Sequence, residues 1–230
     1  MFRYFTYFVF LFLFALSACN TNSMPAPEAR REYFYLALGD SYTIGESVSE
    51  DERWSVQLAQ MLRAKGFNIR NPKTIAQTGW TTGELIETLN KTFQQQSYDL
   101  VTLLIGVNNQ YRGQTLETYR AEFRQLLQTA IRYGKNDASR VIVLSIPDWG
   151  VTPFAEGRDR AKIATEIDAF NAVAREETQK VGVTFLDITP LSRKALGDQT
   201  YVADDKLHFS GKMYQEWANL VYPVAESILK

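Results

Sequence analysis

Short apolar runs alternate with longer amphipathic segments along most of the chain. A continuous apolar run predicts a buried strand, because a strand covered on both faces has no polar side. Such runs occupy residues 33–39, 98–106, 140–147 and 183–189, with an interrupted one inside 67–79. Apolar residues spaced three and four apart predict helices. That spacing occurs over residues 54–66, 82–93, 115–134, 162–182 and 211–230.

Local signals refine three of these elements. The dipeptide Asn71-Pro72 interrupts the second predicted strand, because proline has no N–H to donate to a sheet. Either Thr81 or Thr82 is placed to cap the helix that follows. The last helix must accommodate Pro223.

The alternation of strand and helix, repeated five times, predicts the fold class. Parallel strands joined by right-handed helical crossovers place helices on both faces of one sheet. We therefore expect an α/β fold, a three-layer α/β/α sandwich around a mostly parallel, five-stranded sheet of the flavodoxin-like type. Ligands of such sheets bind beyond the carboxyl ends of the strands, so the residues just after each strand are the candidates for a site.

The first 19 residues differ from the rest of the chain. One basic residue, Arg3, precedes an apolar stretch from Tyr4 to Leu16 and then small residues. A charged start, a short apolar core and a small-residue end predict a secretory signal peptide. The alternative is a retained membrane anchor helix, but the core is shorter than the roughly 20 apolar residues that spanning requires.

The segment "LSAC" at residues 16–19 resembles the bacterial lipoprotein signal, in which the cysteine is lipidated and becomes the new N-terminus. Cys19 is the only cysteine of the chain, which excludes an intramolecular disulfide. We expect lipidated Cys19 to hold the protein on a membrane of the bacterial envelope. Asn20 replaces the aspartate of the inner-membrane retention rule, which favours the outer membrane. The expected organisation is a signal peptide at 1–19, a flexible tether at 20–32 and one domain at 33–230.

Composition and charge exclude several classes of function. The chain has 25 basic and 26 acidic residues, so it lacks the basic excess typical of nucleic-acid binding. It contains no phosphate-binding glycine loop and no G-x-S-x-G nucleophile elbow. With one histidine, a zinc site would consist of carboxylates alone, which is unusual. We expect neither a metal nor a cofactor, and the sequence leaves the oligomeric state open.

Candidate chemistry gathers after the predicted strands. Ser41 follows the first strand, and a serine hydroxyl becomes a nucleophile when a neighbouring base takes its proton. The chain has a single histidine, so an imidazole base for Ser41 must be His208. Asp205, three residues earlier, can reach the far ring nitrogen and orient the ring, with Asp204 as a neighbouring alternative.

Four blocks together resemble the SGNH, or GDSL, esterases and lipases: G-D-S ending at Ser41, then Gly79, Asn108 and the D-x-x-H ending at His208. They occur in the family's order and cover essentially the whole mature chain. The D-x-x-H spacing selects Asp205. The resemblance implies an oxyanion hole made of the backbone N–H groups of Ser41 and Gly79 and the side-chain amide of Asn108. The chain departs from the family at Asn109, where an aspartate is usual, which puts the geometry of that loop in question.

The predicted function is a serine ester hydrolase that cleaves acyl or acetyl esters through an acyl-enzyme. The alternatives are acyl transfer by the same triad and a catalytically silent, glycan-binding envelope protein. Acetylated sugars, lysophospholipids and simple acyl esters all remain open as substrates. Aromatic residues on the same loops are candidates for a substrate pocket, although each could instead pack around the sheet ends. They are Trp80, Tyr111, Trp149, Phe154 and Phe209.

Overall fold

The computed structural model describes residues 1, 2, 4, 31–92 and 96–230. Arg31–Lys230 form one compact unit. The predicted signal peptide is described only at residues 1, 2 and 4, and Cys19 and nearly all of the tether lie outside the described residues. Within the described parts, none of the helices combines the length and apolar character needed to cross a membrane.

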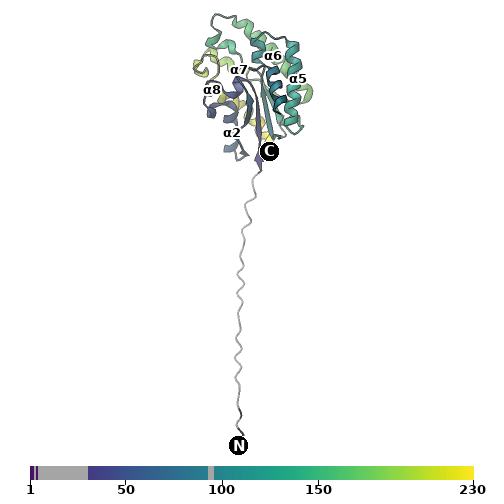
Figure 1. Cartoon of the computed structure of the whole chain (residues 1–230). Helices are drawn as coiled ribbons and strands as arrows, with labels where there is room; N and C mark the ends of the chain where they lie inside the picture. The colour runs from purple at the N-terminus through teal and green to yellow at the C-terminus, as the bar shows by residue number, and fades with distance from the viewer. Residues whose placement is uncertain (3, 5–30, 93–95) are drawn as a thin grey trace. The chain divides into compact units, whose positions relative to one another are not determined.

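One parallel sheet of five strands forms the centre of the unit (Figure 1). Its strand order is β4-β2-β5-β6-β7, which is the flavodoxin-like order and confirms the predicted fold class. The strands are β2 (Tyr35–Gly39), β4 (Lys73–Ala76), β5 (Leu100–Leu104), β6 (Val141–Leu144) and β7 (Thr184–Leu186). Every residue of β2, β5 and β6 is buried, as their apolar runs predict.

Helices cover both faces of the sheet (Figure 1). On one side α2 (Trp54–Ala64) packs against α8 (Gly211–Leu229), and on the other α5 (Leu116–Tyr133) contacts both α3 (Thr82–Lys91) and α6 (Arg160–Val181). Short helices follow several strands: α1 (Ser41–Ile44), α4 (Val107–Tyr111) and α7 (Thr189–Ser192). The 3₁₀ turns are η1 (Glu50–Glu52), η2 (Ala138–Arg140), η3 (Trp149–Val151), η4 (Pro153–Ala155), η5 (Arg193–Leu196) and η6 (Gln199–Tyr201).

The structure differs from the predicted elements mainly at the N-terminal side of the domain. The first predicted strand is two elements, because β1 (Glu32–Tyr33) leaves the main sheet and pairs with β3 (Asn68–Ile69). The break at Asn71-Pro72 separates β3 from β4, as expected. Thr81 is the helix cap: its hydroxyl accepts from the Glu84 N–H, and the Glu84 carboxylate accepts from the Thr81 N–H.

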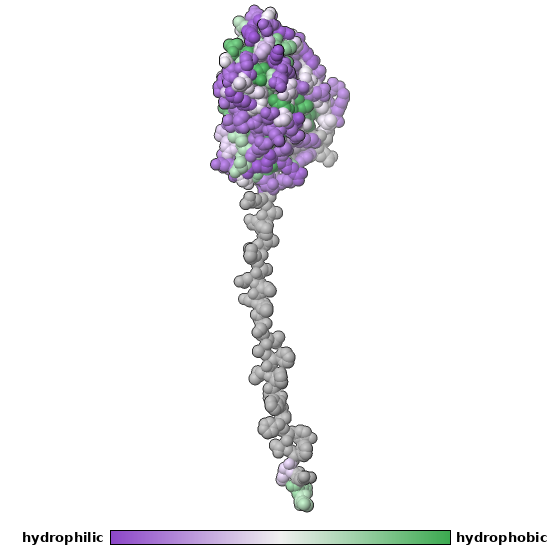
Figure 2. Space-filling model, turned by 90° about the vertical axis from the view of Figure 1, so that its left-hand side faces the viewer, coloured by the Kyte–Doolittle hydropathy of each residue, from purple (hydrophilic) through white to green (hydrophobic). Residues whose placement is uncertain are grey.

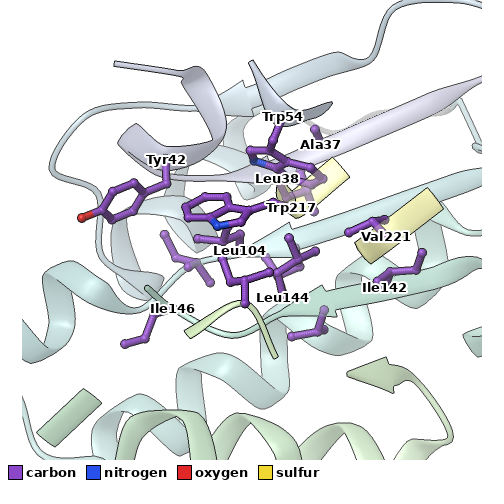
Figure 3. Packing of buried hydrophobic residues seen from close by; sticks show 14 of the residues in the cluster. Ala37, Leu38, Tyr42, Trp54, Leu104, Ile142, Leu144, Ile146, Trp217 and Val221 are labelled. Atoms are coloured by element: carbon purple, nitrogen blue, oxygen red, sulfur yellow. The ribbon is translucent and has the colours of Figure 1, made fainter. Parts of the chain in front are cut away.

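Large aromatic and aliphatic side chains fill the space between the sheet and the α2–α8 layer (Figure 3). Trp54 and Trp217 are fully buried there, beside Leu38 and Leu104. Outside, the face of the domain seen in Figure 2 is mostly hydrophilic, with apolar residues in small patches. The dense core holds the strands rigidly, so the loops at the strand ends start from fixed positions.

The register of the sheet brings three of these loops to one level. Gly39 at the end of β2 pairs with Ala76 of β4 on one side and Leu104 of β5 on the other. Beyond this level, β2 continues into α1, β5 continues into α4, and the chain after β4 turns toward α3. The crevice between β2 and β5 is the switch point of this strand order, where ligands bind.

Candidate active site

A pocket of about 180 Å³ lies where these loops meet. It combines residues from the ends of β2, β4, β5 and β6 and from the loop before α8. Its lining residues are Ser41, Tyr42, Thr78, Gly79, Val107, Asn108, Tyr111, Trp149, Phe154, Leu207 and His208. Ser41, Gly79, Asn108 and His208, predicted from four separate blocks of sequence, therefore line one pocket.

Ser41 is the first residue of α1, directly after strand β2. Asp40 caps this one-turn helix, since its Oδ1 accepts a hydrogen bond of 3.0 Å from the Tyr42 N–H. Burial raises the pKa of the Asp40 carboxyl to about 7, although the hydrogen bond from Tyr42 favours the charged form. Gly45 ends the helix in the left-handed conformation. The short helix thus holds Ser41 next to the carboxyl end of strand β2.

His208 and Asp205 form a directly bonded pair. Asp205 Oδ2 lies 2.6 Å from His208 Nδ1, and Asp205 Oδ1 accepts the N–H groups of Leu207 and His208 at 2.9 Å each. Asp205 Oδ2 also accepts a hydrogen bond of 2.6 Å from the Ser47 hydroxyl. Partial burial opposes ionisation of Asp205, but the donors Ser47 and His208 outweigh it and lower its pKa to about 2. Asp205 is therefore a carboxylate at neutral pH, as an orienting partner of an imidazole must be.

Ser41 and His208 face the same pocket without a direct bond: among the described residues, the Ser41 hydroxyl makes no hydrogen bond. Catalytic hydrogen bonds are often long in ligand-free enzymes and shorten when substrate binds. The ring of Tyr42, next to Ser41, meets the His208 ring edge-on at 5.4 Å between centroids. The position of the imidazole relative to Ser41 is therefore set by buried packing.

Three groups are placed to donate to an oxyanion. Within the described parts of the chain, the backbone N–H groups of Ser41 and Gly79 have no acceptor. Gly79 adopts a φ of +84°, which a glycine reaches without strain, and its carbonyl accepts a 2.5 Å hydrogen bond from Arg112. The Asn108 side-chain amide donates to the Trp80 carbonyl at 2.9 Å, which orients the amide and leaves its second N–H for a ligand.

Asn109, which replaces the aspartate usual in the resembling family, joins the loops that carry Gly79 and Asn108. Its Oδ1 accepts the Thr82 N–H at 3.1 Å, and its Nδ2 donates to the Thr82 hydroxyl at 2.5 Å and to Gln114 Oε1 at 2.7 Å. The Thr82 hydroxyl in turn donates to the Glu122 carboxylate. An amide supplies the donors that this network needs, so the asparagine supports the loop geometry.

An aromatic wall forms one side of the pocket. The rings of Tyr111, Trp149 and Phe154 contact one another, with centroids 5.4–6.4 Å apart. Trp149 is buried and donates to Gln110, whereas Tyr111 and Phe154 are 48% and 38% exposed at the rim. The Arg158 guanidinium lies 5.0–5.5 Å from the three ring centroids and packs against the rings without lining the pocket.

Two of the five aromatic candidates do not line the pocket. Phe209 is fully buried and packs between Tyr42 and Trp217, because the backbone after His208 turns into the core. Trp80 is half-buried and contributes its carbonyl to Asn108 rather than its ring to the pocket. Ser47, whose hydroxyl donates to Asp205, is not predicted from the sequence, because no motif or spacing marks it as a partner.

The described residues contain no group of three or more histidine, cysteine, aspartate and glutamate side chains arranged to hold a metal ion. Besides two tyrosines, the polar residues of the pocket lining are Ser41, Thr78, Asn108 and His208. These are the groups of nucleophilic and acid–base chemistry.

Replacing Asn109 by Asp is expected to lower the free energy of unfolding by about 1–3 kcal/mol, measured by urea unfolding at neutral pH. The new carboxylate and Glu122 would compete for the single proton of the Thr82 hydroxyl. In the double variant Asn109→Asp/Glu122→Gln, the introduced amide supplies the missing donor and most of the stability should return. A loss of stability that is independent of residue 122 would contradict the network.

Comparison with known proteins places this chain in a family. The model of the GDSL-like lipase/acylhydrolase family matches residues 37–216. No curated protein matches the chain.

Three solved structures share the fold. TesA matches with a TM-score of 0.65 at 18% identity, over 86% of this chain and 99% of its own. The lipase/acylhydrolase from Enterococcus faecalis has a TM-score of 0.64 at 24% identity, over 86% and 97%. Axe2, an acetylxylan esterase from Geobacillus stearothermophilus, has 0.66 at 18%, over 84% and 94%. The family match spans most of the domain, so this chain belongs to the GDSL-like lipase/acylhydrolase family and is a carboxylic ester hydrolase.

Proposed function

We propose that the enzyme cleaves esters through an acyl-enzyme, with Ser41 as nucleophile, His208 as general base and Asp205 as the orienting carboxylate. The observation that carries this proposal is the 2.6 Å contact between Asp205 and His208, made by a histidine that lines the same pocket as Ser41. The bond to Asp205 Oδ2 holds the His208 proton on Nδ1, which leaves Nε2 unprotonated for the serine.

The proposed reaction has two halves. Ser41 Oγ attacks the ester carbonyl while its proton passes to His208 Nε2, and the imidazolium is stabilised by Asp205. The oxyanion is bound by the N–H groups of Ser41 and Gly79 and by Asn108 Nδ2, each worth roughly 3 kcal/mol of the barrier by analogy with measured cases. The alcohol leaves with the proton from Nε2. Water then attacks the acyl-enzyme by the same route and releases the acid.

Ser41→Ala is expected to abolish labelling by a fluorophosphonate probe and to lower kcat/KM for esters by about 10³-fold or more. His208→Ala should have a similar effect, and Asp205→Asn should lower kcat by about 10²- to 10⁴-fold because the ring loses its orienting acceptor. Ser139→Ala, which removes an exposed hydroxyl remote from the pocket, is the control. Folded protein that neither reacts with the probe nor cleaves any ester would instead favour the glycan-binding alternative.

The pocket supports a short acyl group. Its volume of about 180 Å³ is below the roughly 300–1,000 Å³ typical of sites for drug-sized ligands, and aromatic rings close one side. Axe2, an acetylxylan esterase, has the same fold, so acetylated sugars remain among the candidate substrates. In acyl transfer an alcohol attacks the acyl-enzyme, whereas in hydrolysis water does. Product analysis with and without an added alcohol separates the two.

We expect kcat/KM for p-nitrophenyl esters to fall at least about tenfold between the acetate or butyrate and the octanoate, because the aromatic wall blocks longer chains. Phe154→Ala, which opens the rim of the wall, should reduce this difference. Leu196→Ala is the matched control, since Leu196 is an exposed apolar residue that does not line the pocket. Increasing activity with chain length in the unmodified enzyme would contradict a short-acyl pocket.

We also propose that the enzyme is an exported lipoprotein, held on the envelope through lipidated Cys19. The support is the sequence of residues 1–20, most of which lies outside the described residues. Cys19→Ala should abolish incorporation of radiolabelled palmitate and release the protein from the membrane fraction. Asn20→Asp should move it from outer-membrane to inner-membrane fractions of a density gradient. Membrane association and labelling that are unchanged in Cys19→Ala would refute the anchor.

A further inference from the structure

We infer that Ser47 is a positioning residue for the acid–base pair, acting through Asp205. The inference rests on the proposed roles of Asp205 and His208. Ser47 lies in the loop directly after α1, the helix that begins with Ser41, and it does not line the pocket. No block of the family resemblance includes it.

The contacts of Asp205 show why this hydroxyl matters. The carboxylate accepts four hydrogen bonds from described residues. The donors from Leu207 and His208 belong to the same loop as Asp205, whereas the Ser47 hydroxyl comes from the loop that carries the nucleophile. Ser47 and His208 Nδ1 share one oxygen, Oδ2, at 2.6 Å each. Ser47 is therefore the donor that fixes this oxygen relative to Ser41.

The backbone at both sides of this contact is strained. Ser47 and Lys206, the residue after Asp205, each have a φ of 64°, in the left-handed region. Residues other than glycine are uncommon there, with asparagine, aspartate and histidine enriched, and such a conformation persists only where the surroundings enforce it. At Ser47 the conformation accompanies a short hydrogen bond to Asp205. The strained backbone thus lies next to Asp205, the acid of the proposed triad.

The residue before Ser47 makes a second connection. The Thr78 hydroxyl donates to the Glu46 carboxylate, and Thr78 precedes Gly79 of the proposed oxyanion hole. The N–H groups of Gly45 and Glu46 both donate to the Ser41 carbonyl at 3.0 Å. Residues 45–47 therefore join three parts of the site: the nucleophile, the oxyanion loop and the acid.

This connection has a kinetic consequence. The Asp205 side chain is 30% exposed, so water competes for its oxygens. Without the Ser47 hydroxyl, the carboxylate has one fewer fixed donor and spends part of its time out of line with His208 Nδ1. We expect the chemical step to slow while substrate binding is kept, because Ser47 does not line the pocket and its hydroxyl donates to Asp205.

The test is Ser47→Gly, because glycine removes the hydroxyl and also adopts a φ of 64° without strain. We expect kcat for p-nitrophenyl acetate to fall about three- to tenfold, with KM within twofold and an unchanged or higher Tm. Ser139→Gly is the matched control, since the Ser139 hydroxyl also donates to an aspartate, Asp137, at 2.7 Å. That variant should keep the kcat of the unmodified enzyme.

A spectroscopic readout separates positioning from folding. The chain has a single histidine, so ¹⁵N-histidine labelling gives one unambiguous imidazole signal from His208. In Ser47→Gly the Nδ1–H proton resonance should broaden through faster exchange with water. The inference is overturned if kcat stays within twofold and the resonance is unchanged, if KM alone rises, or if Tm falls in parallel with kcat. If Asp205→Asn keeps full activity, that result contradicts the proposed triad itself rather than the role of Ser47.

Discussion

The site depends first on the level at which the parallel strands β2, β4 and β5 end. Gly39 lies between Ala76 and Leu104 in register, so the chain leaves the sheet at one height in three neighbouring places. A shift of one residue would exchange the side chains on the two covered faces of β2 and β5, and the close packing of the core on both faces opposes it. The proposed nucleophile and oxyanion donors are therefore brought together by the sheet itself, before any side chain in the pocket interacts with another.

The proposed base, His208, is positioned in a different way. His208 comes from the loop before α8, and no strand pairing places it. Its position depends on Tyr42, whose ring contacts His208, Phe209 and Trp217 (Figure 3 shows Tyr42 and Trp217). Tyr42, which follows Ser41, and Phe209, which follows His208, are thus packed together in the core. Truncating such buried rings would disturb the acid–base geometry as well as stability.

Hydrogen bonds between the loops also position the residues of the pocket. Asn109 and Thr82 join the loops after β5 and before α3, while residues 45–47 join α1 to the loops that contain Thr78 and Asp205. These bonds lie behind the pocket and leave the Ser41 hydroxyl, one Asn108 N–H and the His208 imidazole facing it. The Ser41 hydroxyl makes no hydrogen bond among the described residues, whereas Thr82, Asn109 and Asp205 are hydrogen-bonded, so these supporting residues are held in place before a ligand binds.

The sequence alone determined the order of strands and helices, the fold class and the four blocks that carry the chemistry, because apolar periodicity and short local motifs depend on neighbouring residues. It located Ser41, Gly79 and Asn108 at strand ends and His208 before the last helix, and the single histidine left no choice of an imidazole base. Only the tertiary structure decided that Phe209 is core, that Asn109 suits its network and that Ser47 contacts Asp205 across 158 positions of chain. Long-range contacts of this kind depend on how side chains from distant parts of the chain pack together, and no periodic pattern in the sequence indicates them.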